Sequence, residues 1–108
     1  MKVDAQALKG HLDTLLLASL ENGPRHGYAV KETLRTSSAA QFDLPTGTIY
    51  PALRRLEAAG LVKGTWSEVG GRRRTYELTG PGRQRLARDR AAWRDFAAAV
   101  SAILEPAP

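Results

Sequence analysis

The chain of 108 residues is 43% apolar and 25% charged, which predicts one small globular domain and excludes two ordinary domains or a wholly disordered chain. Its 16 Lys and Arg outnumber its 11 Asp and Glu, for a formal net charge of +5, and a small basic domain favours an anionic partner, nucleic acid before membrane. There is no cysteine, no visible signal peptide and no apolar run of about 18 residues, so disulfides and thiolate sites are excluded and we expect a cytoplasmic protein with no membrane association.

A first helix is predicted from Ala5 to Leu20, because leucines recur on one of its faces. These leucines are Leu8, Leu12, Leu15 and Leu16. Turn residues from Glu21 to Pro24 end this helix. A second, shorter helix is predicted from His26 to about Thr36, and the small polar residues that follow it to Gln41 predict a loop.

A third helix is predicted to begin at Thr48 as its N-cap, because Pro51 then lies in the first turn, where a missing N–H breaks no hydrogen bond. Its buried face is expected to carry Ile49, Leu53, Leu56 and Gly60. At about 100° per residue, the opposite face carries Gly47, Pro51, Arg54 and Ala58. Thr48, Tyr50 and Arg55 are expected on the flanks of this helix.

Two strands joined by a tight turn are predicted after the third helix. They run from Leu61 to Trp66 and from Arg73 to Leu78, because both segments carry residues that favour strands. The turn between them contains Gly70 and Gly71, which tolerate positive φ.

A long last helix is predicted from Thr79, as its N-cap, to about Leu104. Leu86, Trp93 and Val100 lie seven residues apart and form a heptad-like stripe. A domain this small cannot bury that stripe alone, so we expect a homodimer. The residues expected at the dimer interface are Leu8, Leu12, Leu86, Trp93, Phe96, Val100, Ile103 and Leu104.

This order of elements predicts a mostly α (α+β) fold, a winged helix-turn-helix with a two-stranded β wing and a long C-terminal dimerisation helix. Residues 1–79 would form the DNA-binding domain and residues 80–105 the dimerisation helix, packed as one compact unit. In such a fold the third helix enters the major groove of double-stranded DNA and the hairpin reaches the backbone or minor groove. The candidate DNA contacts are Thr46, Thr48, Tyr50, Arg54, Arg55, Lys63, Arg72, Arg73 and Arg74.

Each of these residues also has a plainer interpretation. Thr48 can serve only as a helix cap, and Tyr50 can pack partly in the core. Arg55 can pair with the nearby Glu57 or Glu32 instead of DNA. An arginine run is often only a solvated surface, but here it stands beside a glycine turn and after a helix-turn-helix, which favours contact with phosphates or the minor groove.

A family resemblance rests on six sequence blocks: His26–Tyr28, Gly47–Glu57, Gly60–Val62, Gly71–Arg74, Tyr76–Thr79 and Gly82. In this order they resemble the PadR family of bacterial transcriptional regulators. The resemblance covers the chain from about Leu12 to its end and is most similar to the short subfamily with a single C-terminal helix. Thr79–Gly82 departs slightly from the family pattern, which bears only on where the last helix starts.

The resemblance implies a homodimeric repressor that dimerises through its C-terminal and N-terminal helices and is bound to the nucleoid when on its operator. In some short members, flat aromatic drugs stack on tryptophans of the C-terminal helix at the dimer interface. Trp93 occupies a comparable place here, with Phe96 beside it, so the resemblance suggests an aromatic or drug-like effector. The plainer alternative is that Trp93 only packs in the dimer core.

Other classes of protein have less support in the sequence. An enzyme is not expected, because the two histidines have no acid or nucleophile at a fixed spacing and no phosphate-binding loop is present. A metal-responsive sensor would need His11 and His26 with Asp13 or Glu21, a pattern unlike known metal motifs. A winged helix that only binds proteins would not need the arginines of the wing. We expect no cofactor and no metal.

Overall fold

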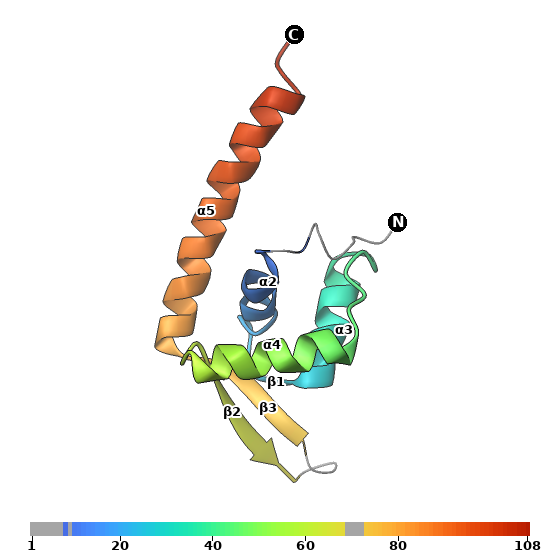
Figure 1. Cartoon of the computed structure of the whole chain (residues 1–108), viewed down its shortest axis with the longest axis vertical. Helices are drawn as coiled ribbons and strands as arrows, with labels where there is room; N and C mark the ends of the chain where they lie inside the picture. The colour runs from blue at the N-terminus through green and yellow to red at the C-terminus, as the bar shows by residue number, and fades with distance from the viewer. Residues whose placement is uncertain (1–7, 9, 69–72) are drawn as a thin grey trace.

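A computed structural model describes residues 8, 10–68 and 73–108 of the chain. The elements follow in the order α2 (Leu12–Ser19), β1 (Arg25–His26), α3 (Gly27–Ser37), α4 (Thr46–Ala58), β2 (Val62–Ser67), β3 (Arg73–Leu78) and α5 (Gly80–Leu104) (Figure 1). Helices α2, α3 and α4 pack together, the hairpin of β2 and β3 extends from them, and α5 projects away from this body. This architecture confirms the predicted winged helix-turn-helix fold.

The first helix is shorter than predicted. Helix α2 begins only at Leu12, because Gly10 has a φ of +85°, which a right-handed helix cannot contain. Leu8 lies before this break and is buried. The predicted start at Ala5 lies outside the described residues.

The sheet has three strands rather than the two predicted. Its order is β1-β3-β2 and both pairings are antiparallel, with Arg25 opposite Tyr76 and Val62 opposite Leu78. Strand β1 is only two residues long, between a turn and a helix, and so short a segment shows no alternation of apolar and polar residues. It joins the start of α3 directly to the wing.

Helix α3 begins as predicted, with the Nδ1 atom of His26 accepting a hydrogen bond from the amide of Ala29 at 3.2 Å. Helix α4 begins three residues earlier than predicted, at Thr46, because Pro45 rather than Thr48 is its N-cap. Pro51 therefore lies inside the helix. The hydrogen bond that Pro51 cannot make would have gone to the carbonyl of Gly47, and both residues are exposed, so water can satisfy that carbonyl.

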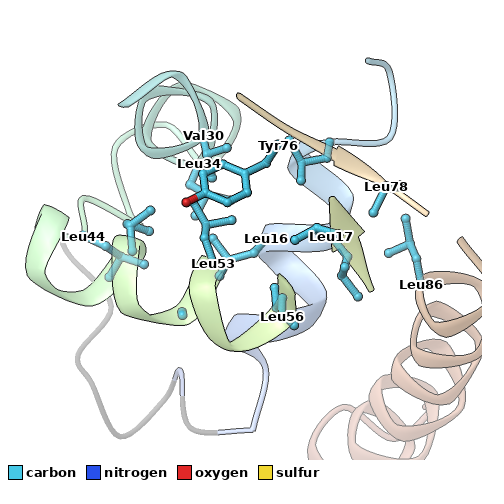
Figure 2. Close-up of a cluster of buried hydrophobic side chains, with 14 of the residues drawn as sticks. Leu16, Leu17, Val30, Leu34, Leu44, Leu53, Leu56, Tyr76, Leu78 and Leu86 are labelled. Atoms are coloured by element: carbon cyan, nitrogen blue, oxygen red, sulfur yellow. The ribbon is translucent and has the colours of Figure 1, made fainter. Parts of the chain in front are cut away.

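The core lies between α2, α3, α4 and one face of the sheet (Figure 2). Its largest fully buried side chains are Leu16, Leu17, Leu20, Val30, Ile49, Leu53, Leu56 and Val62. Tyr76 and Leu78 of β3 cover this cluster, and Leu86 of α5 packs beside Leu78. Gly60 is exposed with a φ of +77°, so it ends the turn after α4 instead of joining the buried face as predicted.

Helix α5 starts as predicted, with the hydroxyl of Thr79 accepting a hydrogen bond from the amide of Gly82 at 3.1 Å. After Leu86 most of its residues are exposed. The molecule measures 58 × 31 × 21 Å, because a helix of 25 residues is about 37 Å long and extends beyond the body. Among the described helices, none combines the length and the apolar character that crossing a bilayer requires.

Candidate nucleic-acid interface

One face of α4 is free of the core. Gly47, Pro51, Arg54 and Ala58 are exposed, whereas Ile49, Leu53 and Leu56 on the other side are buried. These are the two faces predicted from helical periodicity, apart from Gly60. Arg54 forms no ion pair with any other described residue, so its guanidinium is free to meet an anionic partner.

The first turns of α4 combine polar exposure with close packing. Thr46 is exposed, and Thr48 and Tyr50 are half-buried. The ring of Tyr50 lies against Gly27 at the start of α3, where an added Cβ would be 2.5 Å from Tyr50 Cε1. Tyr50 therefore has the packing role that the sequence left open, and Gly27 leaves room for its ring.

The ion-pair partner of Arg55 differs from the two that the sequence suggested. It forms an ion pair with Asp13 of α2, rather than with Glu57 or Glu32. Glu32 pairs instead with Arg35 on its own helix. The Arg55 side chain thus ties α4 to α2.

The residues predicted on the wing divide into two groups. Lys63 and Arg73 are exposed, and Arg73 Nη1 lies 3.1 Å from His26 Nε2. Arg74 turns inward, pairs with Glu57 of α4 and lies over the rings of Trp66 and Tyr76. Arg72 and the predicted turn glycines lie outside the described residues.

A cleft of about 730 Å³ separates the start of α3, the middle of α4 and the inner face of the wing. Tyr28 and Trp66 are each 53% exposed on its walls, beside Arg54 and Arg73. Cations and flat aromatic side chains together suit contact with phosphates, sugars and bases. Neither Tyr28 nor Trp66 is among the DNA contacts predicted from the sequence, although the His26–Tyr28 block contains the first of them.

A second groove, of about 660 Å³, lies between α2 and α5. The His11 and Trp93 rings meet edge to face at 5.3 Å between centroids, and Phe96 lies 6.1 Å from Trp93. Among the predicted dimer residues, five are exposed on α5: Trp93, Phe96, Val100, Ile103 and Leu104. Leu8 and Leu86 are buried in the chain's own core, and Leu12 is partly buried against it. The chain itself therefore covers these three side chains, wholly or in part, without a second copy.

Polar contacts fix α5 against α2 and against the turn that follows α2. Arg90 donates two hydrogen bonds to Glu21, at 2.8 and 3.0 Å, and this guanidinium lowers the pKa of the Glu21 carboxyl. Asp89 accepts hydrogen bonds from Thr14 of α2 and from Arg85.

The same contacts bear on the metal alternative. Glu21 is engaged by Arg90, Asp13 by Arg55, and His26 caps α3. No three potential metal-ligating side chains come together within the described part of the chain.

Comparisons with known proteins agree on one family. The model of the transcriptional regulator PadR-like family matches residues 16–88. A transcriptional regulator of Mycobacterium tuberculosis is 40% identical over 77 residues, which are 70% of this chain and 59% of that protein. The crystal structure of a PadR family transcription regulator from Clostridium difficile is 33% identical, with a TM-score of 0.78, and the match covers 88% of this chain and 99% of that chain.

The fold is also shared with Bacillus subtilis PadR, whose crystal structure is a complex with operator DNA. That match has a TM-score of 0.65 and 24% identity, and it covers 70% of this chain and 44% of that chain.

Proposed function

This chain belongs to the PadR-like family of transcriptional regulators, and from that membership we propose that it is a homodimeric repressor of a pseudo-palindromic DNA operator. The family consists of transcriptional regulators and not of enzymes. The cytoplasm, at the nucleoid, is the place of action that this function requires.

The observation that carries the proposal is the exposed face of α4 beside the exposed cations of the wing. Arg54 on α4 would read a base edge in the major groove, and Lys63 and Arg73 would hold phosphates. Thr46 and Thr48 lie at the start of α4, where their hydroxyls suit phosphate oxygens. The Bacillus subtilis relative, with its operator DNA, supports this docking.

Arg55 and Tyr50 have structural partners and are kept only as secondary DNA contacts, and Arg74 pairs with Glu57. Arg72 remains a predicted phosphate contact.

The exposed stripe of α5 supports the homodimer. Ile103 and Leu104 are 79% and 73% exposed, and a partner helix that covered them would contribute about 25 cal/mol per Å² of apolar surface buried. Residues 80–105 would then form the dimerisation helix on a DNA-binding domain of residues 1–79. A two-fold dimer would place two copies of α4 in successive major grooves, about 34 Å apart.

The groove between α2 and α5 supports a site for a flat aromatic effector. A ligand stacked on Trp93 and Phe96 would shift how the two DNA-binding domains are spaced and so release DNA. Planar cationic and neutral dyes should quench Trp93 fluorescence and weaken DNA binding, with the Trp93→Phe variant showing no quenching. A dye series without quenching or release would leave Trp93 and Phe96 as dimer residues alone.

The first test is fluorescence anisotropy of a labelled duplex from the region upstream of the protein's own coding sequence, against a scrambled duplex, at two salt concentrations. We expect sequence-dependent, salt-sensitive binding of two chains per duplex. Equal, weak binding to both duplexes would move the operator elsewhere. No binding even at low salt would favour the alternative of a winged helix that binds proteins.

A further inference from the structure

The guanidinium of Arg74 is engaged by groups of the protein itself. Its Nη2 atom donates to Glu57 Oε2 at the C-terminal end of α4. Its Cζ atom lies 5.3 Å from the ring centroid of Trp66 and 6.0 Å from that of Tyr76. Only 28% of the Arg74 side chain is exposed, so this cation is poorly placed to neutralise a DNA phosphate.

Gly64 of β2 provides the space in which this ion pair lies. A Cβ added to Gly64 would be 2.7 Å from both Arg74 Nε and Glu57 Oε2, closer than real Cβ contacts. The Gly64 amide also donates to Glu57 Oε2, at 3.2 Å. One carboxylate oxygen of α4 therefore accepts hydrogen bonds from both strands of the wing.

These contacts lie near the outer end of the hairpin, far from the point where the chain leaves α4. Trp66 lies opposite Arg74 in the register of β2 and β3, and the next pair, Ser67 with Arg73, is the last of the described ladder. The chain already joins α4 to the base of the wing at residues 59–61. Strand β1 also attaches β3 to the start of α3, at Thr75 and Tyr76. The contacts of Glu57 add an attachment to α4 itself near the outer end, and this opposes rotation of the hairpin relative to that helix.

We propose that Glu57, Gly64, Trp66 and Arg74 form a wing latch that fixes the angle between the wing and α4 for DNA binding. Glu57 and Arg74 are thus positioning residues, and Arg73 beside them is held where it can reach the backbone. The inference rests on the proposed DNA-binding function. It also reassigns Arg74 from a phosphate contact to a support of the wing.

For Glu57→Gln, the latch and simple electrostatics predict changes of DNA affinity in opposite directions. Glu57→Gln removes a negative charge from a DNA-binding face, which by itself strengthens binding. Loss of the latch instead weakens operator binding, by about three- to tenfold. Glu77→Gln is the matched control, because Glu77 is exposed on the same wing and outside the latch; it should bind DNA as well as or better than the wild type.

Arg74→Lys separates a support from a phosphate contact. A lysine keeps the positive charge but cannot reproduce the flat guanidinium held between Glu57 and Trp66. We expect weaker binding with an unchanged dependence of log K on log salt, and no further loss in the double variant with Glu57→Gln. Unchanged affinity of Arg74→Lys, or a salt slope reduced by about 0.9 in Arg74→Ala, would assign Arg74 to a phosphate instead.

A readout without DNA tests the latch itself. The Gly64 amide should exchange with solvent about tenfold faster in Glu57→Gln than in the wild type, because its hydrogen-bond acceptor becomes neutral and weaker, while the melting temperature changes little. Unchanged exchange, or tighter DNA binding by Glu57→Gln than by the wild type, would overturn the latch alone. A wild type that binds no DNA would overturn the proposed function, and with it the role of the latch in DNA binding.

Discussion

Two glycines in the first turn of α5 differ sharply in the space around them. A Cβ on Gly82 would overlap the carbonyl oxygen of Leu61, which is held in place because it accepts a hydrogen bond from the Thr79 amide at 3.2 Å. A Cβ on Gly80 would meet no atom within 4 Å. Gly82 is therefore needed for α5 to pack against the turn before β2.

From this contact we expect Gly82→Ala to lower the free energy of unfolding by about 1–3 kcal/mol, as overpacking does. Gly80→Ala, in the same turn, should be neutral or stabilising by up to about 1 kcal/mol, because alanine loses less backbone entropy in a helix. Urea denaturation of both variants measures the difference. Equal stability of the two would show that α5 does not lie against Leu61 as described.

Arg73 and Arg54 should contribute differently to DNA binding. Arg73→Ala should weaken binding to all sequences alike and reduce the slope of log K against log salt by about 0.9 for each phosphate that is no longer neutralised. Arg54→Ala should cost about 1–3 kcal/mol on the operator and less on random DNA, because a base contact carries specificity. Titrations of operator and scrambled duplexes at several salt concentrations separate the two. Identical losses on both duplexes for both variants would contradict these roles.

Which residues are exposed could be predicted from the sequence more reliably than what they contact. Helical periodicity alone places Arg54 opposite the core. The partner of Arg55, by contrast, is Asp13 on another helix, and that of Arg74 lies seventeen positions earlier, at Glu57. Such pairs depend on how helices and strands meet in space, which a local pattern does not contain.

Whole helices and strands are also predicted well only where the signal is local in the sequence. The amphipathic segments of α3 and α5 and the hairpin of β2 and β3 carry repeated local signals, so their bounds agree with the prediction within one or two residues. Strand β1 exists because β3 offers it hydrogen bonds at Arg25 and His26. The predicted bounds differ from those found at the break at Gly10 and at the start of α4 at Thr46.

The attachment of α5 to the turn after α2 should depend on pH through Glu21. Its pKa lies below the ordinary value of 4.5 because Arg90 donates hydrogen bonds to the carboxylate. A carboxyl whose pKa is lowered by folding stabilises the fold above its unfolded-state pKa, and this contribution is lost as the pH falls through the folded-state pKa. The Glu21–Arg90 pair therefore contributes at neutral pH and disappears in acid.

We accordingly expect Glu21→Gln to melt at a lower temperature than the wild type at pH 7, and the difference to vanish as the pH falls below 4.5. Thermal melts followed by circular dichroism from neutral to acid pH measure it. Glu105→Gln serves as the control, because Glu105 forms no ion pair with the described residues. A difference that stayed constant into acid would mean that the Glu21 charge is not what anchors α5.

At the scale of the whole molecule, most of the large apolar side chains that stay exposed among the described residues lie on α5. Its first turns belong to the core through Leu86, whereas five large apolar side chains farther along it stay exposed: Trp93, Phe96, Val100, Ile103 and Leu104. At about 100° per residue they share one face, and Ala98 lies on the opposite one. An apolar stripe on a projecting helix is typical of a surface that a second copy covers.

This stripe leads us to expect that Val100→Glu converts the dimer into a monomer, because a carboxylate would lie unpaired in the apolar interface. Ala98→Glu adds the same charge to the same helix on the other face and should remain dimeric. Light scattering at micromolar concentration reads the mass of each variant directly. Circular dichroism should show that both keep their helix content.

DNA binding by the same two variants connects the interface to the operator. In a two-fold dimer the second half-site binds intramolecularly, at an effective concentration in the millimolar range for closely linked domains. A monomer loses that gain, so Val100→Glu should bind a full operator hundredfold or more weakly, about 2.7 kcal/mol, yet bind a single half-site as the wild type does. Ala98→Glu should show a much smaller loss, from its added negative charge alone. If Val100→Glu were monomeric and still bound the full operator with wild-type affinity, the two copies of α4 would act independently, and the proposed pairing of half-sites through α5 would be wrong.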